Sequence, residues 1–400
     1  MIELSSVASK LARERSQRSQ VFAPGLRREV MSASEGMSDV IRLARGDPDF
    51  NTPSNIAAAA ARAPDLGWTH YTSWNGAREL RCGIVDKLER ENNLKVDPDT
   101  EVAVTGGAQE ALFVAMQMLV EAGDEVLLPD PHYSAYDGAI ALTGATSVLV
   151  PTRGENRFEL EVGELEARLS PRTKLLVLVD PSNPAGAVLS PDKVEELAAW
   201  VVKNDLLVLS DEVYEKLVFD GHAHTSIGSL PGMYERTVSI FSFSKTYAMT
   251  GWRVGYMVGP ADFIECAGEL HYVVSICASA PAQLAAIEAL NGSQKHAEEM
   301  VESYRSRRDF LAASLEDIGW PCPPPHGGFS VMADIRNTGK TSIEMFRYLL
   351  ETAHVQVMPG ALYGPSGEGY IRISVLAPQE QLVEASRRIA TAADALRSGD

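Results

Sequence analysis

The alternation of short apolar runs with longer helical segments between residues 101 and 260 most constrains how this chain can fold. Each run ends at glycine, proline or small polar residues, and the runs lie at 101–105, 125–129, 174–179, 206–210 and 238–241. Such runs are typical of buried strands, and the segments 108–120 and 191–204 have the length and pattern of helices. Strands that alternate with helices form a mostly parallel sheet with helices on both faces, so the sequence predicts an α/β fold.

The pattern changes near residue 260, after one more expected strand at 254–258. Helices are expected at 261–272, 281–290 and 295–318, and a stiff proline-rich segment follows at 321–328. The strands and helices expected beyond it lie at 329–333, 342–352, 355–358, 370–374 and from 378 onward. We therefore expect a smaller α+β domain at the C-terminus. The predicted division is an N-terminal arm with part of the small domain at 1–45, a large domain at 46–290 and the small domain at 291–400.

Composition and charge exclude some partners. The formal net charge is −18, whereas nucleic acids and anionic membranes attract basic surfaces, so neither is expected as a partner. The four cysteines are far apart and form no C-x-x-C pair, which is typical of a reduced cytoplasmic protein. The chain shows no signal pattern and no apolar run as long as a membrane span, and its histidines lack metal-ligand spacing. We expect a cytoplasmic protein without a bound metal.

The polar residues with the clearest chemical meaning follow the apolar run 238–241. Lys245 would lie at the carboxyl end of a buried strand, where desolvation lowers the pKa of an ammonium and leaves an amine that can form a Schiff base with a carbonyl. Ser242, Ser244 and Arg253 are donors suited to a phosphate. A lysine for an aldehyde beside an arginine for a phosphate suggests pyridoxal phosphate. The alternative is a surface Lys/Arg pair that follows a core strand.

Three other strand ends carry candidate site residues. Gly106 and Gly107 separate a strand from a helix, which suits either an anion site at the helix N-terminus or a simple tight turn. Asn183 lies between two prolines that hold its loop rigid. Asp211 emerges from four apolar residues, so its carboxylate needs a cation such as a protonated pyridine nitrogen, unless it caps a helix.

Two further residues have both a functional and a structural interpretation. Tyr133 follows a predicted strand, where it could stack on a flat cofactor or simply pack in the core. Arg372 alternates with Ile371 and Ile373 in a predicted strand, so it points to the opposite face. There it could clamp a carboxylate with its two-pronged guanidinium, or it could be an edge-strand arginine in solvent.

Taken together, these stretches resemble the class I/II aminotransferases, which are fold type I pyridoxal phosphate enzymes, and most resemble their bacterial aspartate aminotransferase-like subgroup. The likeness runs from about residue 40 to 396. It rests on motifs that share their order with the family: G-D-P-D-F at 46–50, Y-x-x-x-x-G at 71–76, G-G-A-Q-E-A-L at 106–112, P-H-Y at 131–133, P-S-N-P-A-G at 181–186, S-D-E-V-Y at 210–214, S-F-S-K-T-Y-A-M-T-G-W-R-V-G at 242–255 and Y-I-R-I-S at 370–374. The resemblance implies a seven-stranded, mostly parallel sheet in the large domain.

The resemblance also implies roles for individual residues around pyridoxal phosphate. Lys245 would carry the cofactor as a Schiff base and later move a proton, and Asp211 would pair with the pyridine nitrogen. Around the ring, Tyr214 and Asn183 would hydrogen-bond its O3′ oxygen and Tyr133 would stack on it. The groups implied at the phosphate are the N–H groups of Gly107, Ala108 and Gln109, together with Ser242, Ser244 and Arg253.

Substrate binding and assembly follow from the same resemblance. Arg372, Gly46 and Asn183 would bind the α-carboxylate of the amino acid. Tyr71 would reach the phosphate of the other subunit's cofactor, which implies a homodimer. The expected activity is transfer of an amino group between an α-amino acid and a 2-oxo acid by a ping-pong mechanism.

The sequence departs from the subgroup at two places. Dicarboxylate-specific members have a lysine where this chain has Gln109, so neutral or aromatic amino acids are expected to be used at least as well as aspartate. The sequence does not place Arg27 or Arg28, which could replace that lysine, in the pocket. The stretch H-G-G-F-S at 326–330 replaces the usual G-A-F-Y and could change the side-chain pocket.

Two rival functions share the fold. One is a β-lyase (C–S lyase) or another enzyme, such as a cyclase, that uses the same quinonoid chemistry to eliminate a leaving group. The other is a non-catalytic regulator, which carries an N-terminal DNA-binding domain for which the residues before Gly46 leave no room.

Overall fold

A seven-stranded sheet forms the centre of the computed structural model, which describes residues 25–398. Its strand order is β2-β8-β7-β6-β5-β3-β4. The strands are β2 (Val102–Thr105), β3 (Glu125–Asp130), β4 (Thr146–Pro151), β5 (Thr173–Val179), β6 (Leu207–Asp211), β7 (Thr237–Ser242) and β8 (Gly255–Val258). Strand β8 runs antiparallel to both of its neighbours, and the other described strands run parallel. The predicted mostly parallel sheet is confirmed.

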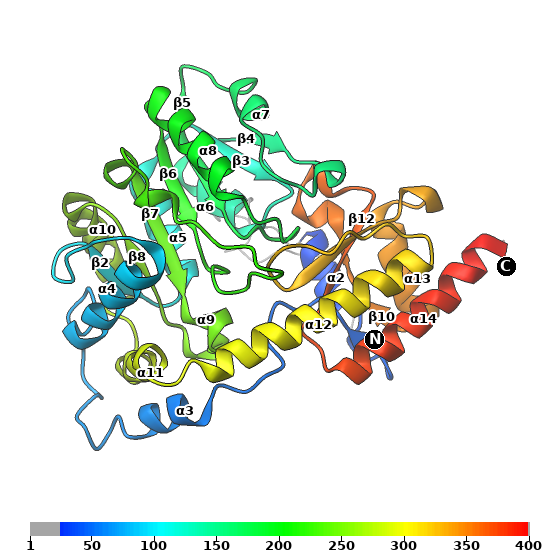
Figure 1. Cartoon of the computed structure of the whole chain (residues 1–400), viewed down its shortest axis with the longest axis horizontal. Helices are drawn as coiled ribbons and strands as arrows, with labels where there is room; N and C mark the ends of the chain where they lie inside the picture. The colour runs from blue at the N-terminus through cyan, green and yellow to red at the C-terminus, as the bar shows by residue number, and fades with distance from the viewer. Residues whose placement is uncertain (1–24, 399–400) are drawn as a thin grey trace, which may run out of the picture.

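Helices cover both faces of this sheet (Figure 1). Alternate side chains of one strand enter different cores: Leu175 and Val177 pack with helices on one face, and Leu176 and Leu178 pack with those on the other. The first face is covered by α5 (Ala108–Leu119), α6 (Ala135–Thr143) and α10 (Ala261–Ser275), and the second by α7 (Val162–Glu166) and α8 (Pro191–Lys203). This two-residue period follows from the pleat of a strand.

A third group of helices packs beside β2 and β8. It comprises α3 (Ser54–Ala61), α4 (Arg78–Asn92) and α11 (Ala280–Asn291). Helix α11, like α5, α8 and α10, was predicted from the sequence to within a few residues. The edge strand β4 was not predicted, because most of its side chains are only partly buried and its sequence begins with two polar residues.

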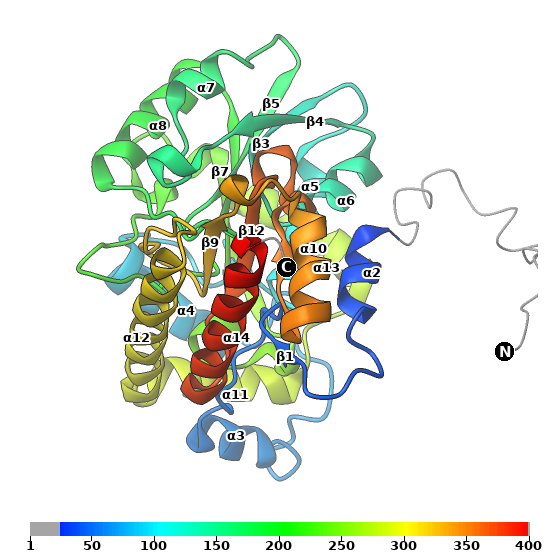
Figure 2. The same cartoon turned by 90° about the vertical axis from the view of Figure 1, so that its right-hand side faces the viewer.

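A second, smaller sheet is built from the C-terminal part of the chain. Its order is β11-β12-β9, with β11 (Met358–Pro359), β12 (Tyr370–Ser374) and β9 (Ser330–Asp334) antiparallel. The helices α12 (Lys295–Asp317), α13 (Ser342–Ala353) and α14 (Gln379–Ser398) pack around it (Figure 2). The single strand expected at 355–358 is wrong, since the chain divides there into β10 (Val355–Gln356) and β11, which belong to different sheets.

The N-terminal segment joins this smaller unit. Strand β1 (Ile41–Arg42) pairs in parallel with β10, and Val30 of helix α2 (Leu26–Ser32) lies in the same core as the C-terminal helices. The first part of the predicted arm, residues 1–24, lies outside the described residues. Between residues 25 and 398, no helix is both long and apolar enough to cross a membrane.

Candidate active site

A cavity of about 640 Å³ opens at the carboxyl ends of β5, β6 and β7, facing the smaller sheet. In sheets of this kind, ligands bind outside the carboxyl ends of the strands. Most of the predicted site residues line this cavity: Gly46, Ala108, Gln109, Tyr133, Asn183, Asp211, Tyr214, Ser242, Ser244, Lys245, Arg253 and Arg372. Of the remaining two, Gly107 does not line the cavity, and Tyr71 lines a separate hollow.

Lys245 lies on α9 (Phe243–Thr246), a single helical turn that begins directly after β7. Its ammonium group donates a hydrogen bond to the carbonyl oxygen of Gly46 and lies 5.3 Å from the centre of the Phe329 ring. Burial lowers the pKa of Lys245 to about 8; Asp47 opposes this shift, and nearby Arg372 adds to it. Lys245 is therefore a cavity lysine with an accessible neutral form, and the alternative of a surface Lys/Arg pair is wrong.

Asp211 ends β6 and is 8% exposed. Its carboxylate accepts hydrogen bonds from the Tyr136 hydroxyl and, at 3.2 Å, from the Val213 N–H. Burial nevertheless raises the pKa of Asp211 to about 6, and no lysine, arginine or histidine of residues 25–398 forms an ion pair with it. A turn follows instead of a helix, so Asp211 is no helix cap.

The turn between β2 and α5 meets Arg253 at one end of the cavity. The Arg253 guanidinium donates to the carbonyl oxygens of Thr250 (2.9 Å) and Gly106 (3.3 Å). A Cβ on Gly107 would lie 2.6 Å from Arg253 Nη2, and the φ of Gly107 is +90°, so only glycine suits this position.

This turn leaves fewer free donors than the sequence predicted. The N–H of Gly107 donates to the carbonyl oxygen of Thr105 at 2.7 Å, so it is already used within the turn. Ala108 and Gln109 are the first residues of α5, and N–H groups in a first helical turn have no partner within the helix. The donors left for an anion at this helix start are therefore the N–H groups of Ala108 and Gln109 and the guanidinium of Arg253, with Gly107 giving room for the arginine.

Tyr214 and Asn183 lie together on the cavity wall. Asn183 Nδ2 donates to the Tyr214 hydroxyl oxygen at 3.2 Å, and the Tyr214 ring lies 5.3 Å from that of Phe329. Burial raises the pKa of Tyr214, and the negative charge of Asp211 raises it further, so the hydroxyl keeps its proton. Tyr133 lies on another part of the wall, where its ring packs edge-on against Tyr136.

Arg372 occupies the middle strand of the smaller sheet and is 3% exposed. Its Nε donates to the Ser330 hydroxyl at 3.1 Å, and its guanidinium lies 5.2 Å from the centre of the Phe329 ring. The guanidinium is thus fixed in the cavity wall, and the alternative of an edge-strand arginine in solvent is wrong. Phe329 belongs to the stretch 326–330 that the sequence analysis connected with the pocket. Sequence reasoning did not find Tyr136 or Tyr363 as cavity residues, because ordinary packed aromatics show the same pattern.

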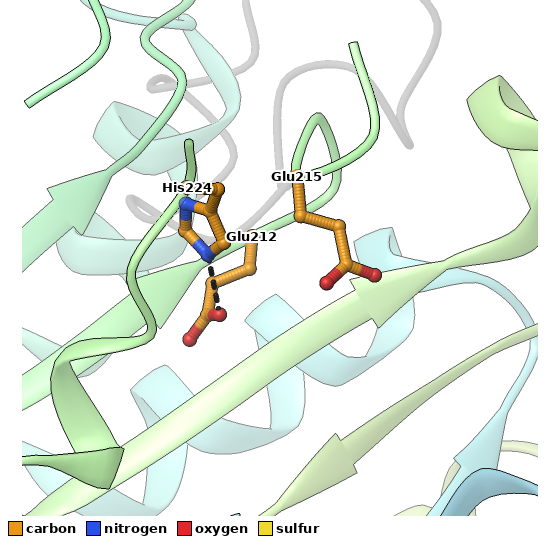
Figure 3. A group of neighbouring side chains, drawn as sticks. All are labelled: Glu212, Glu215 and His224. Carbon is orange, nitrogen blue, oxygen red and sulfur yellow. Dashed lines mark hydrogen bonds and ion pairs between the residues drawn. The ribbon is translucent and has the colours of Figure 1, made fainter. Parts of the chain in front are cut away.

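A second cluster of charged side chains lies close to the cavity. Figure 3 shows Glu212, Glu215 and His224, whose ligand-type atoms lie within 4.8 Å of one another. His224 uses both ring nitrogens, at 3.0 Å from Asp180 and 2.8 Å from Glu212. Burial lowers the pKa of His224, but these hydrogen bonds raise it to about 10 overall.

The protonated ring of His224 has no lone pair for a metal. Glu215 is also engaged, since Lys87 and, at 2.7 Å, Asn92 donate to its carboxylate. The cluster is therefore a charge-compensated ion-pair network that joins the ends of β5 and β6.

Comparison with known proteins agrees with this geometry. The family model for aminotransferase class I and II matches residues 38–389. The chain is 41% identical to an aspartate aminotransferase of Pyrococcus abyssi, covering 94% of this chain and 97% of that one. It is 38% identical to aromatic-amino-acid aminotransferase 2 of Thermococcus litoralis, with the same coverage. The solved aspartate aminotransferase of Rhizobium meliloti superposes with a TM-score of 0.91 at 34% identity, covering 95% of this chain and 98% of that one.

The fold and the cavity are those of a fold type I pyridoxal phosphate enzyme. Within that class, the chain belongs to the class I and II aminotransferase family and is a pyridoxal phosphate-dependent aminotransferase.

The cavity residues fit this cofactor. The buried carboxylate of Asp211, which pairs with no cation among residues 25–398, matches a protonated pyridine nitrogen. Arg253 and the start of α5 match a phosphate, and the neutral form of Lys245 matches an aldehyde. Asp211, Arg253 and Lys245 thus supply complementary groups for the pyridine nitrogen, the phosphate and the aldehyde of pyridoxal phosphate.

Proposed function

We propose that Lys245 is the catalytic lysine of this aminotransferase and that Asp211 and Tyr214 act with it in a ping-pong reaction. The observation that carries the proposal is that one cavity contains both a lysine whose pKa is lowered to about 8 and a buried carboxylate that pairs with no cation among residues 25–398. An amine whose pKa lies near the working pH is partly unprotonated, so it can both bind an aldehyde and exchange a proton.

Bound pyridoxal phosphate supplies an electron sink that accepts the electrons of the substrate Cα–H bond. Lys245 would hold the cofactor aldehyde and would carry a proton between the substrate Cα and the cofactor C4′. Asp211 would keep the proton on the pyridine nitrogen, and Tyr136 holds the Asp211 carboxylate in place. Tyr214 and Asn183 would donate hydrogen bonds to the ring oxygen O3′, and Tyr133 would pack against the ring.

Different residues bind the phosphate of the cofactor and the α-carboxylate of the substrate. Arg253, Ser242 and Ser244, with the N–H groups of Ala108 and Gln109, bind the phosphate. The guanidinium of Arg372, assisted by Asn183 and Gly46, binds the substrate α-carboxylate, because a planar fork of N–H donors matches a carboxylate. Phe329 packs against Lys245 and Arg372 and keeps the two cations in position.

We further propose a homodimer in which Tyr71 binds the phosphate of the partner's cofactor. Tyr71 is 78% exposed and lies outside the cavity of its own chain. The end of α10 also exposes a run of large apolar side chains, Tyr272, Val273 and Val274, which suits a covered surface. Mixing Lys245→Ala with Tyr71→Phe subunits tests this. Hybrid dimers should recover activity above that of either parent; no recovery would place Tyr71 outside the partner's site.

The proposal also includes a cytoplasmic location. It further divides the chain after residues 45 and 290 into an arm, a large domain and a small domain. The four free cysteines support a reducing compartment. The C-terminal core, which also contains Val30 and Leu43, supports the arm as part of the small domain.

A panel of amino donors offered with 2-oxoglutarate or pyruvate tests the function. The amino acid should convert the cofactor to its pyridoxamine form, which absorbs at shorter wavelength, and the new amino acid should appear in equal amount. Lys245→Ala should abolish turnover. Release of ammonia without conversion of the acceptor would indicate a β-lyase instead.

A further inference from the structure

The cavity contains more positive side chains than the proposed chemistry uses. Lys245, Arg253 and Arg372 have roles toward the cofactor and the α-carboxylate. Two other arginines, Arg27 and Arg45, also line the cavity. Both are exposed.

Arg27 reaches the cavity from α2, and its neighbour on the helix shows which face is turned inward. Met31 lies four residues later, which is one helical turn, and it lines the cavity as well. Arg28, the next residue along the helix, does not line the cavity and is exposed. One face of α2, carrying a cation and an apolar side chain, therefore forms part of the cavity wall.

Helix α2 is fixed to the same unit that carries Arg372. Val30 is completely buried in the C-terminal core, and its carbonyl oxygen accepts a hydrogen bond from Gln356 at 2.6 Å. Glu29 forms an ion pair with Arg347 of α13 at 2.6 Å. Arg27 and Arg372 are thus presented to the substrate by one packed unit, and Lys245 and Arg253 by the larger one.

We propose that Arg27 is a specificity-determining residue that binds the second carboxylate of a dicarboxylic substrate. This inference rests on the proposed function and names the substrate class of the same site. A carboxylate that enters the cavity without a cation loses its hydration at high cost. Gln109, which also lines the cavity, offers only a neutral amide, so the cation must come from another residue. Arg27, which lines the cavity from α2, supplies it.

The neighbouring Met31 explains how the same wall accepts other substrates. A ping-pong reaction brings two different side chains to one cavity in turn. An exposed arginine can turn toward solvent when a neutral side chain enters, and Met31 then gives that side chain an apolar, adaptable contact. The expectation that neutral amino acids are used at least as well as aspartate rested on Gln109, because the sequence did not place Arg27 or Arg28 in the pocket. The structure adds a cation for dicarboxylates without removing the apolar contact.

Steady-state kinetics of the holoenzyme with paired acceptors tests the proposal. Arg27→Gln should lower kcat/KM for 2-oxoglutarate at least tenfold and leave kcat/KM for pyruvate within twofold. Arg28→Gln is the matched control, with the same charge change one residue away, and should leave both values unchanged. Calorimetric titration with succinate, which does not react, should show the same loss of affinity in Arg27→Gln, whereas butyrate should bind all forms alike.

The outcomes separate this proposal from the proposed function. A wild-type enzyme that transaminates no amino acid with either acceptor would overturn the function itself. An active enzyme in which Arg27→Gln affects 2-oxoglutarate and pyruvate equally, or neither, would overturn the role of Arg27 alone. Loss of 2-oxoglutarate selectivity in Arg45→Gln but not in Arg27→Gln would also overturn it and assign the role to Arg45.

Discussion

Two adjacent carboxylates at the end of β6 lie in opposite environments. Asp211 faces the cavity, where burial raises its pKa to about 6. Glu212 faces away and is completely buried; burial alone would raise its pKa, yet hydrogen bonds from His224 and Ser226 hold it below the usual range. Within the described part of the chain, no cation pairs with Asp211, whereas His224 pairs with Glu212.

Two lysines repeat this contrast. Lys87 is buried in the second cluster and bonds to Glu215 and Asn92. Lys245 bonds to a backbone carbonyl oxygen, and its pKa is lowered to about 8. Burying charges is costly, so a region whose charges balance internally serves stability, and one whose charges do not is arranged for a ligand. The contrast separates the active site from an ion cluster that resembles a metal site.

The largest expected effect comes from Asp211→Asn, which removes the charge and keeps the shape. We expect kcat to fall about a thousandfold, or about 4 kcal/mol of barrier, because the ring nitrogen loses its ion pair. Bound cofactor, measured by absorbance, should be retained. Turnover near the wild-type level would mean that the charge of Asp211, like that of Glu212, has no role in the reaction.

His224→Asn tests the other side of the contrast. Leaving Asp180 and Glu212 buried without a cation should reduce the free energy of unfolding by about 3 kcal/mol. Denaturant unfolding measures this, with His296→Asn, at an exposed histidine of α12, as the matched control. A drop in kcat at unchanged stability would contradict the structural role.

The same variant has a defined pH dependence. Because the pKa of His224 is raised to about 10, its contribution to stability is complete below its ordinary pKa near 6.5 and is lost as the pH rises through 10. The stability difference between wild type and His224→Asn should therefore shrink from pH 7 to pH 10. A constant difference across this range would show that His224 is neutral in the folded protein.

Tyr136→Phe should give the smallest effect. The hydroxyl of Tyr136 lowers the pKa of Asp211, so its removal should raise that pKa and move the acid limb of the kcat/KM profile to higher pH. We expect about a tenfold loss at neutral pH, in keeping with one hydrogen bond to a charged group. An unshifted acid limb would show that the limb does not report the ionisation of Asp211.

The sequence predicted those parts of the fold and site that depend on local pattern. Lys245 and Asp211 follow apolar runs that are typical of buried strands, and parallel strands bring their carboxyl ends to one edge. Arg372 could be assigned to one face of a strand by its alternation with isoleucines.

Features that depend on tertiary contacts could not be predicted. The approach of Arg27 to the cavity depends on how Val30 packs against residues more than 300 positions away, such as Gln356. The bond from the Gly107 N–H to Thr105 depends on the backbone angles of the turn. His224 is distant in sequence from Asp180, and no local pattern connects the two.

Reduction of the holoenzyme with borohydride, followed by peptide mapping, tests the central claim most directly. Borohydride fixes the cofactor to the lysine that holds it. The account predicts a phosphopyridoxyl group on Lys245, the lysine with the lowered pKa, and none on Lys87. A label on Lys87, or on any lysine other than Lys245, would contradict it.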